Sequence, residues 1–161
     1  YLASISGKTA ALLASSARIG SIVAGHPQEV VDALGAFGHH YGLAFQVVDD
    51  LLDVMATDEE LGKPAGNDLV EGVYTLPVIR ALAGSAGTDL RIMLEGPMDL
   101  ATRDRARNLV RADAAIADTV ATAHGFIDQA RQDLASLSPT PAVRTLLVTC
   151  DLLTDQMSRL S

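Results

Sequence analysis

Apolar and small residues recur every three or four positions along most of the chain, which is the spacing of one face of a helix. Over residues 2–23 this face contains Ile5, Thr9, Leu12, Ser16, Ile19 and Val23. The same period runs from residue 30 to residue 55, and predicts a helix of roughly 26 residues, or about 39 Å at 1.5 Å per residue. Gly25, His26 and Pro27 separate the two helices.

The second half of the chain is also helical by pattern. Residues 56–68 contain two glycines, one proline and four acidic residues but no apolar face, so we expect a loop there, with Asp68 capping the next helix. We expect helices at about 69–83, with Pro77 near the start or at a kink, and at 89–94, 100–112, 116–137 and 143–160. No segment shows sustained period-two alternation, so the chain is predicted to be all-α.

Composition narrows the class of protein. The 161 residues suit a single all-α domain over 1–161, and 48% of them are hydrophobic. The net charge of −8 argues against a nucleic-acid binder. The sequence contains no apolar run of about 20 residues, so we expect no transmembrane segment within it. The single cysteine, Cys150, fits a reducing compartment, so we predict a cytoplasmic protein. Because the chain starts at Tyr1 within a helical pattern, we expect it to be part of a longer protein.

The strongest local signal is a group of three acidic residues, Asp49, Asp50 and Asp53, within the long helix. Asp49 and Asp53 are one turn apart on one face, and Asp50 lies beside that face. Apolar neighbours suggest partial burial, where like charges need a compensating cation. Carboxylate oxygens suit Mg²⁺, which commonly takes one or two of them together with substrate phosphates. A solvated acidic patch on an ordinary helix is the alternative.

Residues near the acidic group add further chemistry. Phe45 and Gln46 precede it by one turn, and Gly38 and Gly42 lie on the same helix at a cost of nearly 1 kcal/mol each relative to alanine. Glycines at this spacing allow a helix or a ligand to approach closely. Lys63, in a glycine-containing loop, suits a phosphate, although a surface lysine in a turn is the simpler interpretation.

Four strings in this order resemble the trans-isoprenyl diphosphate synthases, also called the polyprenyl synthetase family. Gly7-Lys8-Thr9 resembles the lysine–threonine pair of that family. Residues 42–53 resemble its second aspartate-rich motif, residues 61–69 the lysine loop that follows, and residues 75–77 the Thr-Leu-Pro that ends the next block. The resemblance implies a helical bundle of the isoprenoid synthase type, of which this chain would form a part, the C-terminal half.

The resemblance also implies an activity and its residues. The family condenses an allylic prenyl diphosphate with isopentenyl diphosphate in isoprenoid biosynthesis, depends on Mg²⁺, and works as a homodimer or heteromer. By position, Asp49 would be the strongest Mg²⁺ ligand, with Asp50 and Asp53 completing the motif. Lys8 and Lys63 would contact the allylic diphosphate. The reacting centre would be lined by Thr9, Phe45 and Gln46.

Two departures from the family pattern bear on activity. Val73 stands where many members have lysine, so we expect one cationic contact to the diphosphate to be missing or to be supplied from elsewhere. The first aspartate-rich motif is absent from these 161 residues, so the chain alone is predicted to be inactive. Two alternatives stay open: a non-catalytic helical subunit of a heteromeric synthase, and a class I terpene cyclase.

Other polar residues receive simpler interpretations. Four arginines interspersed with acids are predicted to form a solvated, salt-bridged face: Arg103, Arg105, Arg107 and Arg111. His39 and His40 have no carboxylate or cysteine in ligand spacing along their own helix, so a metal role is disfavoured. Cys150 lies on an apolar stripe and is predicted to be a core residue.

Overall fold

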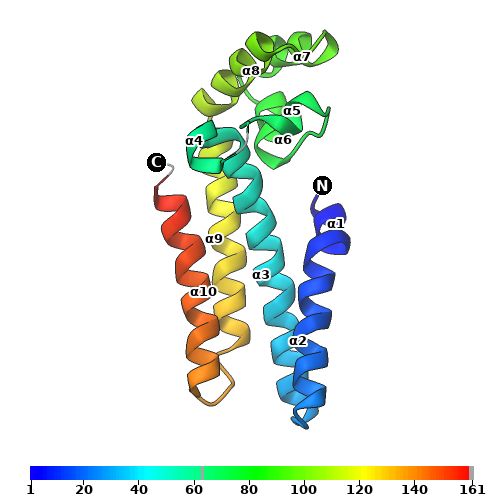
Figure 1. Ribbon diagram of the computed structural model, residues 1–161, viewed down its shortest axis with the longest axis vertical. Helices are drawn as coiled ribbons and strands as arrows, with labels where there is room; N and C mark the ends of the chain where they lie inside the picture. Colours follow the sequence, from blue (N-terminus) through cyan, green and yellow to red (C-terminus); the bar gives the residue numbers. More distant parts are fainter. Residues whose placement is uncertain (63, 160–161) are drawn as a thin grey trace. The chain divides into compact units, whose positions relative to one another are not determined.

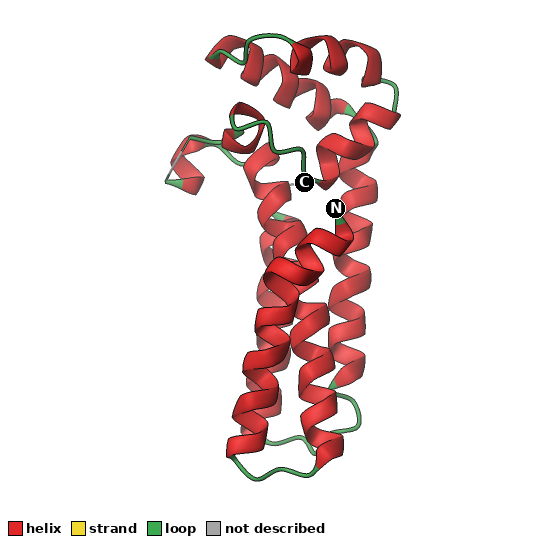
Figure 2. Ribbon diagram, turned by 90° about the vertical axis from the view of Figure 1, so that its right-hand side faces the viewer, coloured by secondary structure: helices red, strands yellow, loops and turns green. Residues whose placement is uncertain are grey.

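The computed structural model describes residues 1–62 and 64–159, and these residues form helices, turns and loops with no strand (Figures 1 and 2). They form two compact units, the first from residues 1–48 and 122–159 and the second from residues 49–121. The all-α prediction is confirmed. The sequence gives no sign of a boundary at these positions, which fall inside helices, and the single domain over 1–161 stays a prediction.

The first unit is a bundle of long helices that lie side by side (Figure 1). It contains α1 (Leu2–Ile5), a π-helical turn η1 (Ser6–Ala10), α2 (Ala11–Val23), most of α3 (Gln28–Met55), the end of α9 (Ala115–Asp133), and α10 (Pro141–Ser158). Thr140 caps α10 by accepting a hydrogen bond from the backbone N–H of Val143 at 3.3 Å. The four long helices agree with the predicted ranges to within a few residues, apart from the end of α9.

Small residues bring α3 against the N-terminal helices. A Cβ atom on Gly38 would lie 2.7 Å from the carbonyl oxygen of Leu13, and one on Gly42 would lie 2.7 Å from the Cα of Ala10. A methyl group has no room at either distance, so α3 touches the neighbouring backbone directly. The sequence allows either a helix or a ligand to approach these glycines, and the structure shows that a helix does so.

The predicted apolar face of the first helix does not pack as expected. Leu12, Ile19 and Val23 are 67%, 61% and 81% exposed, whereas Ala10 and Ser21 are buried. The glycines of α3 leave space for backbone and short side chains, so the side of η1 and α2 with smaller residues faces α3. Periodicity identified a face of this helix but not the face that is buried.

The second unit begins with the end of α3 and holds the shorter helices. These are α4 (Asp58–Leu61), α5 (Asn67–Val70), α6 (Leu76–Ala83), α7 (Gly87–Glu95), α8 (Leu100–Ala112) and the start of α9. The predicted loop over 56–68 contains one helical turn, α4, because Thr57 and Glu60 form a reciprocal capping box. Asp68 is not the predicted cap, since Gly66 occupies that position and Asp68 lies in the first turn of α5.

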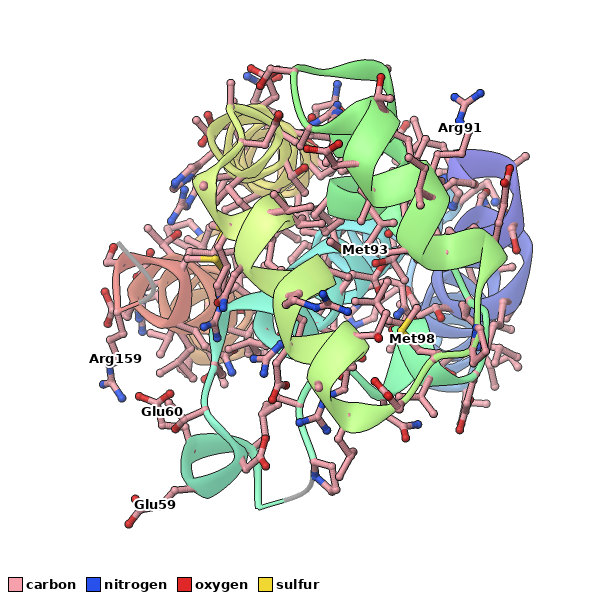
Figure 3. All side chains as sticks on the ribbon, turned by 90° about the horizontal axis from the view of Figure 1, so that it is seen from above. Glu59, Glu60, Arg91, Met93, Met98 and Arg159 are labelled. Atoms are coloured by element: carbon pink, nitrogen blue, oxygen red, sulfur yellow. The ribbon has the colours of Figure 1, made fainter. Side chains whose placement is uncertain are left out.

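The predicted helix over 69–83 is interrupted after Val70 and resumes at Leu76, with Pro77 in the first turn of α6. Pro77 therefore lies near the start of a helix, one of its two predicted positions, rather than at a kink. The first turn suits a residue that lacks a backbone N–H. The core of the unit consists of buried apolar residues from α3, α5, α6, α7, α8 and α9: Val54, Leu69, Val78, Ala81, Leu90, Ala106, Val110 and Ala115. Met93 of α7 packs against this core, and Figure 3 shows Arg91 of the same helix extending outward.

Candidate functional site

The aspartates of the acidic motif differ in their exposure. Asp49 is exposed, but Asp50 and Asp53 are only 3% and 6% exposed. Buried carboxylates are expensive unless hydrogen bonds or positive charge compensate them. The sequence suggested partial burial, and the structure confirms it for two of the three.

A loop folds back onto Asp53 and holds it at two atoms. The backbone N–H of Gly66 donates to the main-chain oxygen of Asp53 at 2.8 Å, and the backbone N–H of Asp68 donates to its carboxylate Oδ2 at 3.4 Å. Gly66 has φ +72°, a left-handed conformation that favours glycine. Its position gives the loop the turn that brings both N–H groups to Asp53. Lys63, predicted to contact a diphosphate from this loop, lies outside the described residues.

Two arginines of α8 close the C-terminal end of α3. Arg107 donates to the carbonyls of Val54 at 3.1 Å and 3.2 Å and of Ala56 at 2.6 Å. Arg111 donates to the carbonyls of Val54, Met55 and Ala56 at 2.8 Å, 2.7 Å and 3.2 Å. The last carbonyls of a helix have no partners within it, and they carry partial negative charge that favours cations. Both arginines therefore act as side-chain caps of the helix that carries the acidic motif.

This result corrects the predicted solvated arginine face. Arg103 and Arg107 are only 8% and 7% exposed, and burial, together with the nearby Arg111 and Arg103, lowers the pKa of Arg107. Arg105 is exposed, as predicted. A signal was available in the sequence, because Arg103, Arg107 and Arg111 follow each other at four-residue intervals on the same helical face as the apolar Ala106 and Val110.

In the first unit the structure brings together two of the residues predicted to line the reacting centre. The hydroxyl of Thr9 donates to Oε1 of Gln46 at 2.9 Å, across 37 positions of sequence. Lys8, its neighbour in η1, is exposed. Phe45 is 46% exposed, and its ring lies 6.4 Å from the ring of Tyr41. The π-helical turn at Lys8 and Thr9 was not predicted, and such turns occur frequently at functional sites.

A long-range contact or burial affects three further residues of the first unit: His40, Cys150 and Tyr41. Nδ1 of His40 lies 2.6 Å from Oδ2 of Asp133 on α9, a partner 93 positions away that the local pattern could not reveal. Cys150 is buried, as predicted, and burial raises the pKa of its thiol. Burial likewise raises the pKa of the Tyr41 phenol.

The acidic motif offers oxygen ligands, but not a complete cage. Within residues 1–62 and 64–159, no three His, Cys, Asp or Glu side chains are grouped so that they could hold a metal ion by themselves. Mg²⁺ does not require such a group, because it commonly binds one or two carboxylates and takes its other ligands from water and substrate phosphates. The buried oxygens of Asp50 and Asp53 fit that kind of site. Among the described residues, no helix is long and apolar enough to cross a bilayer.

The described residues form an all-helical fold, and the acidic motif lies near the C-terminal end of its long helix α3. Comparison with known families is specific: the polyprenyl synthetase family matches residues 1–111, and the chain belongs to this family. The four strings named above all lie inside the matched region.

Curated proteins similar to this chain are prenyl diphosphate synthases. Heptaprenyl diphosphate synthase component 2 of Geobacillus stearothermophilus is 39% identical over 148 residues, which cover 91% of this chain and 46% of the relative. Nonaprenyl diphosphate synthase of Mycobacterium tuberculosis is 37% identical over 155 residues, or 94% of this chain and 46% of the relative. The chain therefore spans about half the length of these relatives.

Solved structures give the same result for the fold. Geranylgeranyl pyrophosphate synthase of Corynebacterium glutamicum, complexed with calcium and isoprenyl diphosphate, matches all of this chain and 50% of its own, with TM-score 0.87 and 33% identity. A polyprenyl synthase of Caulobacter crescentus matches all of this chain and 49% of its own, with TM-score 0.88 and 33% identity. The expected bundle of the isoprenoid synthase type is thus confirmed.

Proposed function

We propose that this chain supplies part of the active site of a Mg²⁺-dependent prenyltransferase that condenses an allylic prenyl diphosphate with isopentenyl diphosphate. The observation that carries the proposal is the pair of buried carboxylates, Asp50 and Asp53, on the helix where the family resemblance places its second metal motif. The named relatives support the reaction class, and the Corynebacterium structure contains both a divalent cation and an isoprenyl diphosphate.

In this proposal Asp49, Asp50 and Asp53 hold Mg²⁺ together with substrate oxygens. Held there, Mg²⁺ would supply positive charge that stabilises the diphosphate as a leaving group. In the reaction the allylic carbon–oxygen bond breaks and pyrophosphate leaves, a carbon–carbon bond forms to isopentenyl diphosphate, and the proton lost from the isopentenyl unit passes to the released pyrophosphate.

The remaining residues bind and orient the substrate. Lys8 is exposed, so its ammonium group is available to an anionic substrate, and Lys63 keeps its predicted role as a second contact. The hydrogen bond between Thr9 and Gln46 fixes both side chains at the side of η1. Phe45, half-exposed and supported by Tyr41, presents an aromatic face suited to a developing carbocation.

A direct test measures metal binding by the purified chain. Electron paramagnetic resonance of Mn²⁺, titrated with and without inorganic pyrophosphate, should show binding that pyrophosphate strengthens. D50N and D53N should weaken it by about tenfold or more, since each removes a charged ligand, whereas D89N, an exposed aspartate of α7, should not. Wild-type chain that binds no Mn²⁺, or a D53N variant that binds like wild type, would refute the proposed site.

We also propose that the chain works with a polypeptide that carries the first aspartate-rich motif, either in the same protein or in a partner subunit. Two observations support this: the chain spans about half of its relatives, and α2 exposes an apolar stripe of Leu12, Ile19 and Val23. The relative from Geobacillus is named as one component of its synthase. The proposed location is the cytoplasm, because the free Cys150 suits a reducing compartment.

The assembly proposal has its own test. Radiolabelled isopentenyl diphosphate should give no prenyl product with the 161-residue chain alone, and should give product when a polypeptide with the first motif is added. Product from the chain alone would show that it needs no partner. A mixture in which the D53N variant supports normal synthesis would favour the alternative of a non-catalytic subunit. The match to the polyprenyl synthetase family favours a synthase over a terpene cyclase.

A further inference from the structure

We propose that Arg107 is a positioning residue for the acidic motif: its guanidinium fixes the last turn of α3, and its side chain supports the loop that holds Asp53. The inference rests on the proposed function, since it concerns the geometry of the proposed Mg²⁺ site. All the residues involved belong to the second unit.

The first line of evidence is the way Arg107 holds the end of α3. Its Nε and Nη2 atoms donate to the carbonyl of Val54, the residue directly after Asp53, and Nη2 also donates to Ala56. Arg111 adds a second guanidinium on the same carbonyls. A planar guanidinium can donate to several acceptors in a fixed geometry, which an ammonium group cannot reproduce. The backbone next to Asp53 is therefore fixed from outside its own helix.

The second line of evidence is the contact between Arg107 and the loop. A Cβ atom built on Gly66 would lie 2.4 Å from Cδ of Arg107, so the arginine side chain occupies the space beside the glycine. Gly66 is also the residue whose N–H donates to the main-chain oxygen of Asp53. Two residues later, the backbone N–H of Asp68 donates to the Asp53 carboxylate. Arg107 thus reaches Asp53 by two routes, through Val54 and through Gly66.

The third line of evidence is electrostatic. Asp50 and Asp53 are buried near the C-terminal end of α3, where the helix dipole already disfavours negative charge. Arg107 is buried as well, and attraction to Asp53 is among the interactions that favour its charged form. The cation offsets the charge of the motif and at the same time sets its position.

The experiment compares R107M, R107K and the control R105M, an exposed arginine on the same helix. R107M removes the charge and the hydrogen bonds, whereas R107K keeps the charge and loses the guanidinium fork. Mn²⁺ affinity is measured by electron paramagnetic resonance in the presence of inorganic pyrophosphate. Hydrogen exchange of the Gly66 and Asp68 amides is followed in parallel, and urea unfolding reports whether each variant is folded.

We expect R107M and R107K both to bind Mn²⁺ about tenfold more weakly, as is usual when a residue that supports metal ligands is lost. The Gly66 and Asp68 amides should exchange faster in both variants, and R105M should match wild type. A merely structural role would change the urea midpoint but leave Mn²⁺ affinity of the folded protein unaltered, and that result would overturn the inference.

The other outcomes are equally decisive. Wild-type affinity in R107K together with weak binding in R107M would show that charge alone matters, which contradicts positioning by the fork. Loss of folding in both variants would make Arg107 a folding residue and refute the inference. Wild-type chain that binds no Mn²⁺ with pyrophosphate would instead refute the proposed function, so the two failures are distinguishable.

Discussion

The contact between Gly42 and Ala10 gives the most direct test of how α3 packs in the first unit. In G42A the new Cβ would lie 2.7 Å from Cα of Ala10, 3.1 Å from Cδ1 of Leu13 and 3.2 Å from Cβ of Ala10. Ordinary carbon contacts are about 3.5–4.0 Å, so the first distance is short by roughly 1 Å. The nearest atom belongs to the backbone of η1, so the conflict requires the helices to move apart.

The expected magnitude follows from three effects. Overpacking of a well-packed interface costs about 1–3 kcal/mol. Replacing glycine by alanine within a helix returns nearly 1 kcal/mol. Separation of η1 from α3 would also weaken the hydrogen bond from Thr9 to Gln46, which is worth about 1 kcal/mol. We therefore expect G42A to lower the free energy of unfolding by about 1–3 kcal/mol.

The assay is urea unfolding followed by circular dichroism, with G125A as the matched control. Gly125 lies inside α9, and a Cβ there would meet no atom within 4 Å. G125A gains the helix propensity without the clash, so its urea midpoint should rise while that of G42A falls. If G42A raised the midpoint as G125A does, the close approach of α3 to η1 would be refuted.

Three further predictions concern the diphosphate, acid stability and the thiol. V73K places an ammonium group at a half-exposed position where the backbone N–H donates to the carbonyl of Asp68. It should tighten pyrophosphate binding, measured by calorimetry, roughly tenfold, since a charged hydrogen bond is worth about 1.5–3 kcal/mol. Unchanged binding would show that residue 73 does not face the ligand. The hydrogen bond from the backbone N–H of Thr102 lowers the pKa of Asp99, so its stabilising contribution is complete above its unfolded-state pKa and is lost as pH falls through the lower folded-state pKa. D99N keeps a good N-cap, and its urea midpoint should therefore fall less steeply between about pH 5 and pH 2 than that of wild type; an identical slope would contradict this. Burial raises the pKa of Cys150, so a disulfide reagent should label it at least about tenfold more slowly in the folded protein than in urea, and equal rates would contradict its burial.

Sequence periodicity predicted the ranges of the long helices well because apolar and small residues recur at the helical period along each of them. It predicted less about which stripe is buried, as α2 shows: Leu12 and Ile19 follow the helical period but are exposed. The deciding factor lies on α3, where Gly38 and Gly42 allow only small groups to approach. Periodicity within one helix contains no information about the shape of the helix that packs against it.

The candidate site was predictable to the extent that its residues are adjacent in sequence. The acidic motif, and the magnesium chemistry proposed for it, follow from spacing along one helix. The hydrogen bond between Thr9 and Gln46 joins two residues that the family resemblance had already singled out. His40 and Asp133 lie on different helices and are 93 positions apart in sequence, so no local pattern could reveal their contact. The π-helical turn η1 was missed for a related reason, since its sequence is compatible with an ordinary helix.

The arginines of α8 show why the contacts around the acidic motif could not be predicted from local sequence patterns. Acidic residues near the C-terminal end of a helix violate a local rule, because both the helix dipole and their mutual repulsion oppose them. Such violations are expected at functional sites, where other parts of the fold compensate for them. Here the compensation comes from Arg107 and Arg111, more than fifty positions away in sequence. The arginines interspersed with Asp104 and Asp113 suggested solvent exposure, but the carbonyls at the end of α3 offer buried acceptors that only the folded chain brings within reach. The acidic motif and its arginine caps therefore form one connected structural feature at the end of α3.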